Sequence, residues 1–545
     1  MPSTRQTYPV EFKGGLVTNM SPLQQGINMP GSARTLRNFE PSIEGGYRRI
    51  LGYTKYNSSI IPPYGAPVVH GASQSGTTLI IGNIHQTPEA GDTLTVTGVT
   101  GTYTIASGGV SFDASNNRAT LTLTGSLASS PANAAAVTFV TTTSNYLTLG
   151  CGVYLDRVIV ARNDDLFKIS SSTVTHINVP NYGTVLVNGA SQTGSSLAVD
   201  GLTAAPQAGD VFKIAGVNLV YTVTSDASVS SGGATVAINP ALASSPADDA
   251  AITFLSVSRE SASKTRFSRY NYTGTEKIAI VDGTNAPALY DNTTFTVLDS
   301  GPTNILSASF VVNFKNQLFF GKSNLLTFTA PYTDNDFTAA SGSGTISLGG
   351  AITGLIVFRQ QLIIFTESSI FQLVGNTISD FQLQPITTDI GCVDTDTIQE
   401  VGGDVMFLGP DGLRLLSGTD RIGDFGLGVV SKSIQKEVTS FISTNTSFAS
   451  IVIRNKSQYR LLGYNTNITQ ENAQGILGTQ FSGQGGEGMA WGELRGIRAY
   501  VADSRFYQNA ETIVFANDDG YLYQMEDGNS FDSLNIQTTF ATPFI

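Results

Sequence analysis

Short apolar runs that meet at tight turns are the main pattern along this chain. Residues 402–418 read GGDVMFLGPDGLRLLSG, in which the run VMFL is followed by the turn PDG and then by the run LRLL. Two short apolar runs joined by such a turn are typical of a β-hairpin. This stretch therefore predicts a hairpin of two buried strands.

The same unit recurs elsewhere in the chain. From residue 277 onward, successive starts lie 39, 45 and 43 residues apart, a spacing typical of four-stranded β-propeller blades. The runs alternate little, which favours strands buried on both faces between neighbouring blades. We therefore predict an all-β fold with a β-propeller of about six blades, and a sheet sandwich with many hairpins is the alternative. The units lie at 157–170, 277–291, 316–329, 361–374, 404–417 and 511–525.

A duplication lies in the first half of the sequence. GASQSG at 71–76 and TYTI at 102–105 match GASQTG and VYTV, both 118 residues later. SLASSPANAAAVTF at 126–139 matches ALASSPADDAAITF 115 residues later. β-branched runs between Gly, Asp and Asn turns predict that each copy is a small β-sandwich or barrel. We place the two modules at 67–141 and 185–256, as insertions into early propeller loops.

The remaining segments complete the predicted organisation. We assign 1–66 to an N-terminal docking segment with the first propeller strands, 142–184 to a blade, and 257–545 to the other blades. One helix is predicted at 431–442, where Ile434, Val438 and Phe441 or Ile442 form an apolar stripe that packs between blades.

Composition narrows the class of protein. The 545 residues carry a net charge of −12 and only 13% charged side chains, which argues against a nucleic-acid binder with a basic stripe. No apolar run reaches about 18 residues, and the N-terminus shows no apolar signal segment. We therefore expect a protein made in a cytoplasm and without stable membrane insertion. Cys151 and Cys392 are predicted to be buried free thiols.

Chemical motifs are scarce in this sequence. His70, His85 and His176 are far apart in the chain, and no metal, nucleophile or phosphate-binding motif includes them. We expect no catalytic, cofactor-binding or metal-binding residues, no cofactor and no enzymatic activity. A carboxylate pair for glycoside hydrolysis needs only proximity in space, so the sequence leaves that alternative open.

Positive charge gathers near the N-terminus. Ser32 is predicted to cap a short helix through Leu36 and Phe39. Arg37, Arg48 and Arg49 form the candidate surface for docking a neighbouring subunit or an adaptor, with solvated arginines as the alternative.

Three phrases carry a resemblance to a known family. They are NFEPSIEGGYRRILGYTKY at 38–56, GGDVMFLGPDGLRLLSGTDRIGD at 402–424 and VFANDDGYLYQMEDGNSFD at 514–532. The chain resembles the tail nozzle proteins of short-tailed bacteriophages, also called tail tubular protein B or packaged-DNA stabilisation proteins. The similarity covers 14–60 and roughly 260–545.

The resemblance implies a structural virion protein of the phage tail. Its relatives form a ring, usually a hexamer, below the portal and adaptor proteins, which retains packaged DNA and opens for ejection. Tail fibres are a further expected partner, and double-stranded DNA passes without specific binding. An acidic chain suits that passage, because neutralised phosphates would add affinity. The alternative is a carbohydrate-binding or carbohydrate-degrading propeller, such as a receptor-binding tail protein. By the resemblance, further β structure is expected beyond FATPFI at 540–545.

Overall fold

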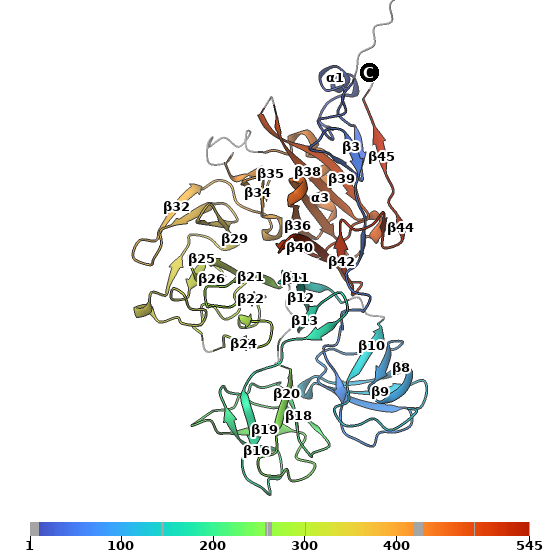
Figure 1. Ribbon diagram of the computed structural model, residues 1–545, viewed down its shortest axis with the longest axis vertical. Coiled ribbons are helices and arrows are strands. Elements are labelled where there is room, and N and C mark those ends of the chain that lie inside the picture. The colour runs from blue at the N-terminus through green and yellow to red at the C-terminus, as the bar shows by residue number, and fades with distance from the viewer. Residues whose placement is uncertain are drawn as a thin grey trace, which may run out of the picture.

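The computed structural model describes residues 10–142, 146–256, 259, 264–299, 301–417, 429–483 and 486–543. Within these ranges the protein is all-β, with many small sheets and few helices. The two duplicated modules lie at one end of the molecule, and helix α1 and strand β45 lie at the other (Figure 1). Between them, seven sheets make up the body.

Each of these seven sheets is built on three or four successive antiparallel strands. In chain order they are β11 (Thr148–Tyr154), β12 (Arg157–Arg162), β13 (Asp165–Ile169) and β14 (Val174–His176); β21 (Arg266–Tyr270), β22 (Lys277–Val281), β23 (Ala288–Tyr290) and β24 (Phe295–Val297); β25 (Phe310–Phe314), β26 (Gln317–Lys322), β27 (Leu325–Phe328) and β28 (Gly344–Ser347); β29 (Ile352–Phe358), β30 (Gln361–Thr366), β31 (Ile370–Val374) and β32 (Gln382–Thr387); β33 (Gln399–Val401), β34 (Asp404–Gly409) and β35 (Gly412–Leu415); β36 (Ser447–Ile453), β37 (Gln458–Tyr464), β38 (Gln474–Gly483) and β39 (Gly486–Arg495); and β40 (Val501–Tyr507), β41 (Ala510–Ala516) and β42 (Leu522–Met525).

The first strands of these sheets contact one another in a closed order. β11 touches β21, β21 touches β25, and β25 touches β29. β29 contacts the short helix Thr395–Thr397 that leads into β33, and β33 touches β36. β36 then touches β40, and β40 returns to β11. We call this arrangement the sheet ring.

Hydrophobic clusters fill the space between neighbouring sheets of the ring. In β12, Val158 and Val160 pack towards the β40–β42 sheet, whereas Ile159 packs towards the β21–β24 sheet. Every pair of adjacent sheets shares such a cluster, including the last sheet and the first. Strands buried on both faces explain the apolar runs with little alternation.

The six predicted hairpin units are confirmed as the β12–β13, β22–β23, β26–β27, β30–β31, β34–β35 and β41–β42 pairs. A propeller of six blades is not confirmed, because the described residues form a ring of seven sheets. The sequence pattern missed the sheet of β36 to β39. Its strands β37 and β38 are separated by residues 465–473 and a 3₁₀ turn, so the tight-turn signal is absent.

Strands from the N-terminal segment join the last two sheets. β1 (Thr35–Arg37) lies between β39 and β45 (Thr539–Ala541), and β4 (Tyr53–Lys55) lies between β42 and β43 (Ser530–Phe531), which pairs with β44 (Leu534–Asn535). β2 (Phe39–Pro41) pairs with β3 (Tyr47–Arg49). The predicted helix from Ser32 to Phe39 is therefore wrong. Pairing with distant strands overrides the local capping signal, and Leu36 is fully buried in the sheet.

The two modules have the same strand order. The first contains β5 (Val68–Val69), β6 (Thr78–Gly82), β7 (Thr93–Val96), β8 (Val99–Asp113), β9 (Arg118–Leu123) and β10 (Val137–Thr141), and the second contains β15 (Gly183–Val187), β16 (Ser196–Leu202), β17 (Val211–Ile214), β18 (Val220–Val223), β19 (Ala234–Asn239) and β20 (Ile252–Ser256). Both sheets run first–second–fifth–fourth–third–sixth strand. Bridges from Val68 to Ala136 and from Leu186 to Ala251 join the edges, so each module closes into a small barrel.

Helices are short and few. α1 (Pro22–Asn28) begins at the capping residue Ser21, and α3 (Gln435–Thr444) continues the 3₁₀ turn Lys432–Ile434. The predicted stripe is confirmed, since Ile434, Val438 and Phe441 are buried in the cluster beside β35 and β37. Other 3₁₀ turns are Ala114–Asn116, Ala339–Ser341, Arg454–Lys456 and Gln470–Asn472. None of the helices in the described ranges is long and apolar enough to cross a bilayer.

Candidate functional site

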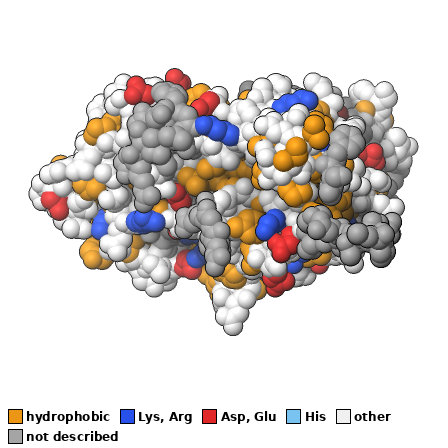
Figure 2. Space-filling model, turned by 90° about the horizontal axis from the view of Figure 1, so that it is seen from above, with side chains coloured by type: hydrophobic (Ala, Val, Ile, Leu, Met, Phe, Trp, Pro, Cys, Tyr) orange, Lys and Arg blue, Asp and Glu red, His pale blue; other side chains and the backbone are white. Residues whose placement is uncertain are grey.

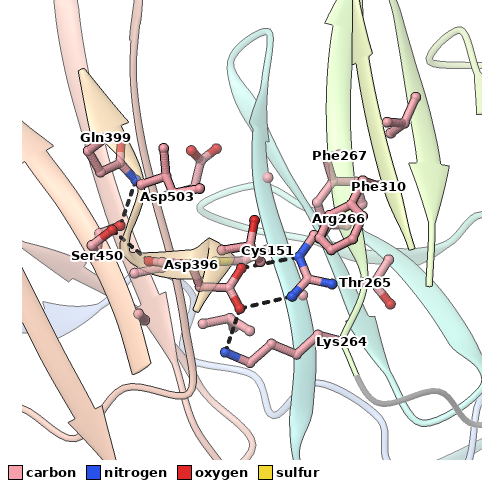
Figure 3. Close-up of a pocket in the computed structure, with 18 of the residues that line it drawn as sticks. Cys151, Lys264, Thr265, Arg266, Phe267, Phe310, Asp396, Gln399, Ser450 and Asp503 are labelled. Atoms are coloured by element: carbon pink, nitrogen blue, oxygen red, sulfur yellow. Dashed lines mark hydrogen bonds and ion pairs between the residues drawn. The ribbon is translucent and has the colours of Figure 1, made fainter. Parts of the chain in front are cut away.

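The centre of the sheet ring holds a cavity of about 230 Å³. Its walls come from the first strands of the ring sheets and from the turn Thr395–Thr397 (Figure 3). Gly150 and Gly152 in β11 allow the close approach of β21, because a Cβ at either position would lie within about 3 Å of Thr265 or Phe267. The ring geometry therefore gathers residues that are distant in the sequence.

Asp396 anchors one side of this cavity. Its carboxylate accepts a 2.8 Å hydrogen bond from Lys264 and hydrogen bonds of 3.1 and 3.2 Å from Arg266. In Figure 3 both cations point across the cavity towards the carboxylate. Burial alone would raise the pKa of Asp396, but the charges of Arg266 and Lys264 outweigh it, so the pKa lies below its usual value. The carboxylate is ionised and paired.

A second ion pair also lines the cavity. Arg269 donates to Asp503 and to the carbonyl of Val153, and Asp503 also accepts a 2.7 Å hydrogen bond from the amide of Val153. Together the two carboxylates tie β21 to β40 and to the turn before β33. The cavity charges thus hold sheets of the ring together.

The cysteines are free and buried, as predicted. Cys151 lines the cavity, and burial together with the charge of Asp503 raises the pKa of its thiol well above the usual value. Burial raises the pKa of the Cys392 thiol to about 12. Both thiols are protonated at neutral pH, which makes them poor nucleophiles.

The predicted docking arginines lie at the end of the molecule that carries α1. Arg37 is within 3.7 Å of Glu493, at ion-pair distance but beyond a hydrogen bond. Arg48 donates a 2.6 Å hydrogen bond to Glu40, and Arg49 donates a 2.9 Å hydrogen bond to the side chain of Asn529. Arg37 and Arg48 remain partly exposed. The three arginines come from neighbouring strands but do not converge on one site.

Glu40 is the residue that sequence reasoning missed in this segment. Its carboxylate is buried and accepts hydrogen bonds from Arg48, Lys456, Gln458 and Arg460. Arg48 is eight residues from Glu40, but the other three partners of Glu40 are more than 400 residues away, so the sequence gave no sign of the network.

An exposed apolar surface lies beside these arginines. Leu23 and Ile27 of α1 are 67% and 73% exposed, and Phe12 and Phe540 stack edge-to-face nearby with ring centroids 5.6 Å apart. Figure 2 looks onto this end of the molecule and shows hydrophobic side chains interspersed with cations and carboxylates. Mixed apolar and arginine-rich surfaces are typical of protein interfaces.

Two of the three histidines meet adjacent aspartates. His85 Nδ1 lies 2.6 Å from Asp164 Oδ2, and His176 Nε2 lies 2.6 Å from Asp165 Oδ1. Burial alone would lower the pKa of His85, but the hydrogen bond to Asp164 and the neighbouring negative charges raise it to about 9. The sequence spacing gave no sign of this cluster, since the hairpin turn at 162–165 and the loop after β6 are brought together only by the fold.

Comparison with known proteins places part of the chain in the phage tail. Residues 180–257 match the family model of the distal tail protein pb9, B domain. This segment is the second module, and the first module is its duplicate. The match indicates a structural protein of a bacteriophage tail, and therefore a component of the virion. No curated protein matches the chain.

Solved structures give only distant similarities. The computationally designed Ika8 protein is 10% identical over 70% of this chain and 96% of its own, with a TM-score of 0.31. PorZ, a bacterial surface component of the type-IX secretion system of Porphyromonas gingivalis, is 9% identical over 73% of this chain and 38% of its own, with a TM-score of 0.33. The N-terminal domain of Nup159 is 10% identical over 48% of this chain and 89% of its own, with a TM-score of 0.28. Similarities this low support no conclusion.

Proposed function

We propose that this protein is a tail nozzle subunit, and that the sheet ring is a seven-bladed β-propeller. In this proposal six copies form a ring at the end of the tail channel, below the adaptor and portal-associated proteins. The ring retains packaged DNA and opens for ejection. The protein acts as a structural component and not as an enzyme.

The observation that carries the proposal is a combination of two features. The second module matches a phage-tail domain, and outside the two modules the body of the chain is a closed ring of sheets. A body closed by hydrophobic clusters on every side suits a particle component that must withstand the pressure of packaged DNA. The family phrases at 38–56 and 514–532 meet in the structure, since β4 pairs with β42. These phrases therefore describe one structural unit, in which an N-terminal strand completes the last sheet.

Charge pairing at the ring centre also supports a structural role. A glycosidase needs a carboxylic acid with a raised pKa at its site. Asp396 lines the cavity, and its pKa is lowered by its cations, whereas Asp394, whose pKa is raised by burial and by the charge of Asp396, is not among the residues that line the cavity. The single tryptophan, Trp491, is buried and donates its indole hydrogen to Val430, so it is not available to stack on a sugar. Both observations favour the nozzle over the carbohydrate-active alternative.

Electron cryomicroscopy of the virion tests the proposal. We expect six copies around the tail axis, beside the adaptor. Native mass spectrometry of the purified chain with its adaptor should show the same stoichiometry. A chain located in a side fibre, or present as a monomer within the particle, would contradict the proposal. A polysaccharide-turnover assay on the purified chain should show no activity above buffer.

A further inference from the structure

Three segments converge where the first module meets the sheet ring. Arg162 donates to Ile61 and Asn163 to Pro63, which joins the hairpin turn 162–165 to the linker 61–66. Asn83 donates a 2.8 Å hydrogen bond to Ala66, which joins the loop after β6 to the same linker. His85 enters this junction from the loop, and Asp164 and Asp165 enter it from the turn.

The three side chains are almost completely buried. Their exposed fractions are 8% for His85, 3% for Asp164 and 2% for Asp165. One nitrogen or oxygen from each lies within 4.8 Å of the others. Ligand atoms that share one metal ion with bonds of about 2.0–2.2 Å lie at most about 4.4 Å apart, so side-chain rotation has to bring these atoms somewhat closer together.

Each of these residues also keeps a polar atom that has no hydrogen-bond partner among the described residues. The atoms are His85 Nε2, Asp164 Oδ1 and Asp165 Oδ2. Buried polar atoms without a partner are costly, so three in one cluster point to a missing ligand. Gly65 allows the Asp165 carboxylate to pack closely there, because a Cβ at that position would lie only 2.2 Å from Asp165 Oδ2.

We propose that His85, Asp164 and Asp165 bind a divalent first-row transition cation such as Zn²⁺. One imidazole and two carboxylates suit such an ion, whereas Ca²⁺ and Mg²⁺ prefer oxygen ligands alone. His176 bonds the other oxygen of Asp165 and so orients that ligand, as second-layer partners of metal ligands commonly do.

The chain contains two internal comparisons. The sequence Asn-Asp-Asp at 163–165 recurs at 517–519 in the turn between β41 and β42. There, Asp518 bonds Arg498 and Tyr464, and Asp519 bonds Tyr523. In the second module, the position equivalent to His85 is Thr203. His85 therefore distinguishes this junction from the turn at 517–519 and from the second module. A bound metal ion would connect the first module to the sheet ring.

Metal uptake by the purified full-length chain tests this proposal. After treatment with EDTA and its removal, the chain is titrated with Zn²⁺ and analysed by native mass spectrometry and calorimetry. We expect one Zn²⁺ per chain, and Co²⁺ in its place should give the visible absorption of a nitrogen- and oxygen-ligated ion. If the parent chain does not take up one equivalent of Zn²⁺, the proposal is overturned before any variant is made.

Variants identify the ligands. His85→Thr, which introduces the residue of the duplicate module, and Asp165→Asn should each weaken Zn²⁺ binding at least tenfold, while His176→Gln should weaken it about tenfold and retain one equivalent. Asp519→Asn is the matched control and should bind like the parent chain. Equal affinity of His85→Thr and the parent would overturn the proposal. The test does not depend on ring formation, so it stands apart from the nozzle proposal.

Discussion

Arg460 and Glu40 lie 420 residues apart in the sequence, yet the guanidinium of one donates a 3.2 Å hydrogen bond to the carboxylate of the other. Both side chains are buried. Arg460 and Lys456 also bond Glu526, so the network connects β2, β37 and the end of β42. It joins the N-terminal segment to the last two sheets of the ring.

Removing Glu40 should destabilise this part of the molecule strongly. Glu40→Ala leaves Arg460 buried with one carboxylate partner instead of two, and breaking a buried ion pair typically costs about 3–5 kcal/mol. Guanidinium unfolding followed by the fluorescence of Trp491, which is buried in the same sheet system, measures the loss. The control is Glu11→Ala, since Glu11 is exposed and, among the described residues, forms an ion pair only with the exposed Lys13. Equal effects of the two substitutions would show that the network contributes no stability.

Asp396 should be the most sensitive carboxylate of the central cavity. Asp396→Asn removes the carboxylate that pairs with both Lys264 and Arg266. We expect a loss of about 2 kcal/mol in the unfolding free energy, because the buried Lys264 then keeps the carbonyl of Phe448 and the ring of Tyr500 but loses its anionic partner. Trp491 fluorescence and thermal unfolding measure it. Asp156→Asn is the control, because Asp156 is largely exposed in its pair with Arg157, and it should change stability far less.

Local sequence was enough to predict the hairpins and insufficient to predict the site. The runs VMFL and LRLL lie on either side of one turn, so the two strands of this hairpin, β34 and β35, are specified within fourteen residues. Arg266 and Asp396 are 130 residues apart and meet only because the ring closes. The two Asn-Asp-Asp turns make the same point, since one tripeptide meets histidines in one sheet and arginine and tyrosines in another. Strand pairing with distant partners also explains why the helix predicted after Ser32 does not form.

The duplication could be predicted because the two modules share short identical sequences. They also share equivalent hydrogen bonds. Tyr64 donates a 2.6 Å bond to Asp92, and Tyr182 donates a 2.7 Å bond to Asp210, at the same offset of 118 residues. The duplicate therefore supplies conservative replacements for residues of the first module, which the next prediction uses.

His70 should make the first module less stable in acid. Burial, together with the charge of Arg118, lowers the pKa of His70 to about 4. The unfolded chain binds this proton near pH 6.5, so the folded module loses stability as the pH falls from about 6.5 to 4 and keeps it above 6.5. His70→Asn, which introduces the residue of the second module at Asn188, should remove about 2 kcal/mol of this dependence, a figure reduced for the partial exposure of the ring.

Hydrogen exchange at β6 and β9 measures this difference in the full-length chain. Comparing parent and variant at each pH cancels the intrinsic dependence of exchange. Strands β16 and β19 of the second module serve as the internal control, since their protection should respond equally in both proteins. A difference between parent and variant that does not change from pH 7 to pH 4.5 would contradict the prediction.

Arg49 offers the cleanest test of the docking segment within the nozzle proposal. Arg48 belongs to the Glu40 network, so its reversal would also disturb the fold, whereas Arg49 is exposed and bonds only the amide oxygen of Asn529 among the hydrogen bonds of its side chain in the described residues. We expect Arg49→Glu to leave Trp491-monitored unfolding unchanged and to weaken ring or adaptor assembly at least tenfold, because an arginine fork pairs well with a carboxylate and a glutamate repels it. Native mass spectrometry of the chain with its adaptor measures assembly. Lys213→Glu in the second module, far from this end of the molecule, is the charge-matched control and should assemble normally. If Arg49→Glu particles assemble fully and fail only at DNA ejection, the segment faces the channel. The six copies of Arg49 in the parent ring would then contact DNA phosphates instead of a protein partner.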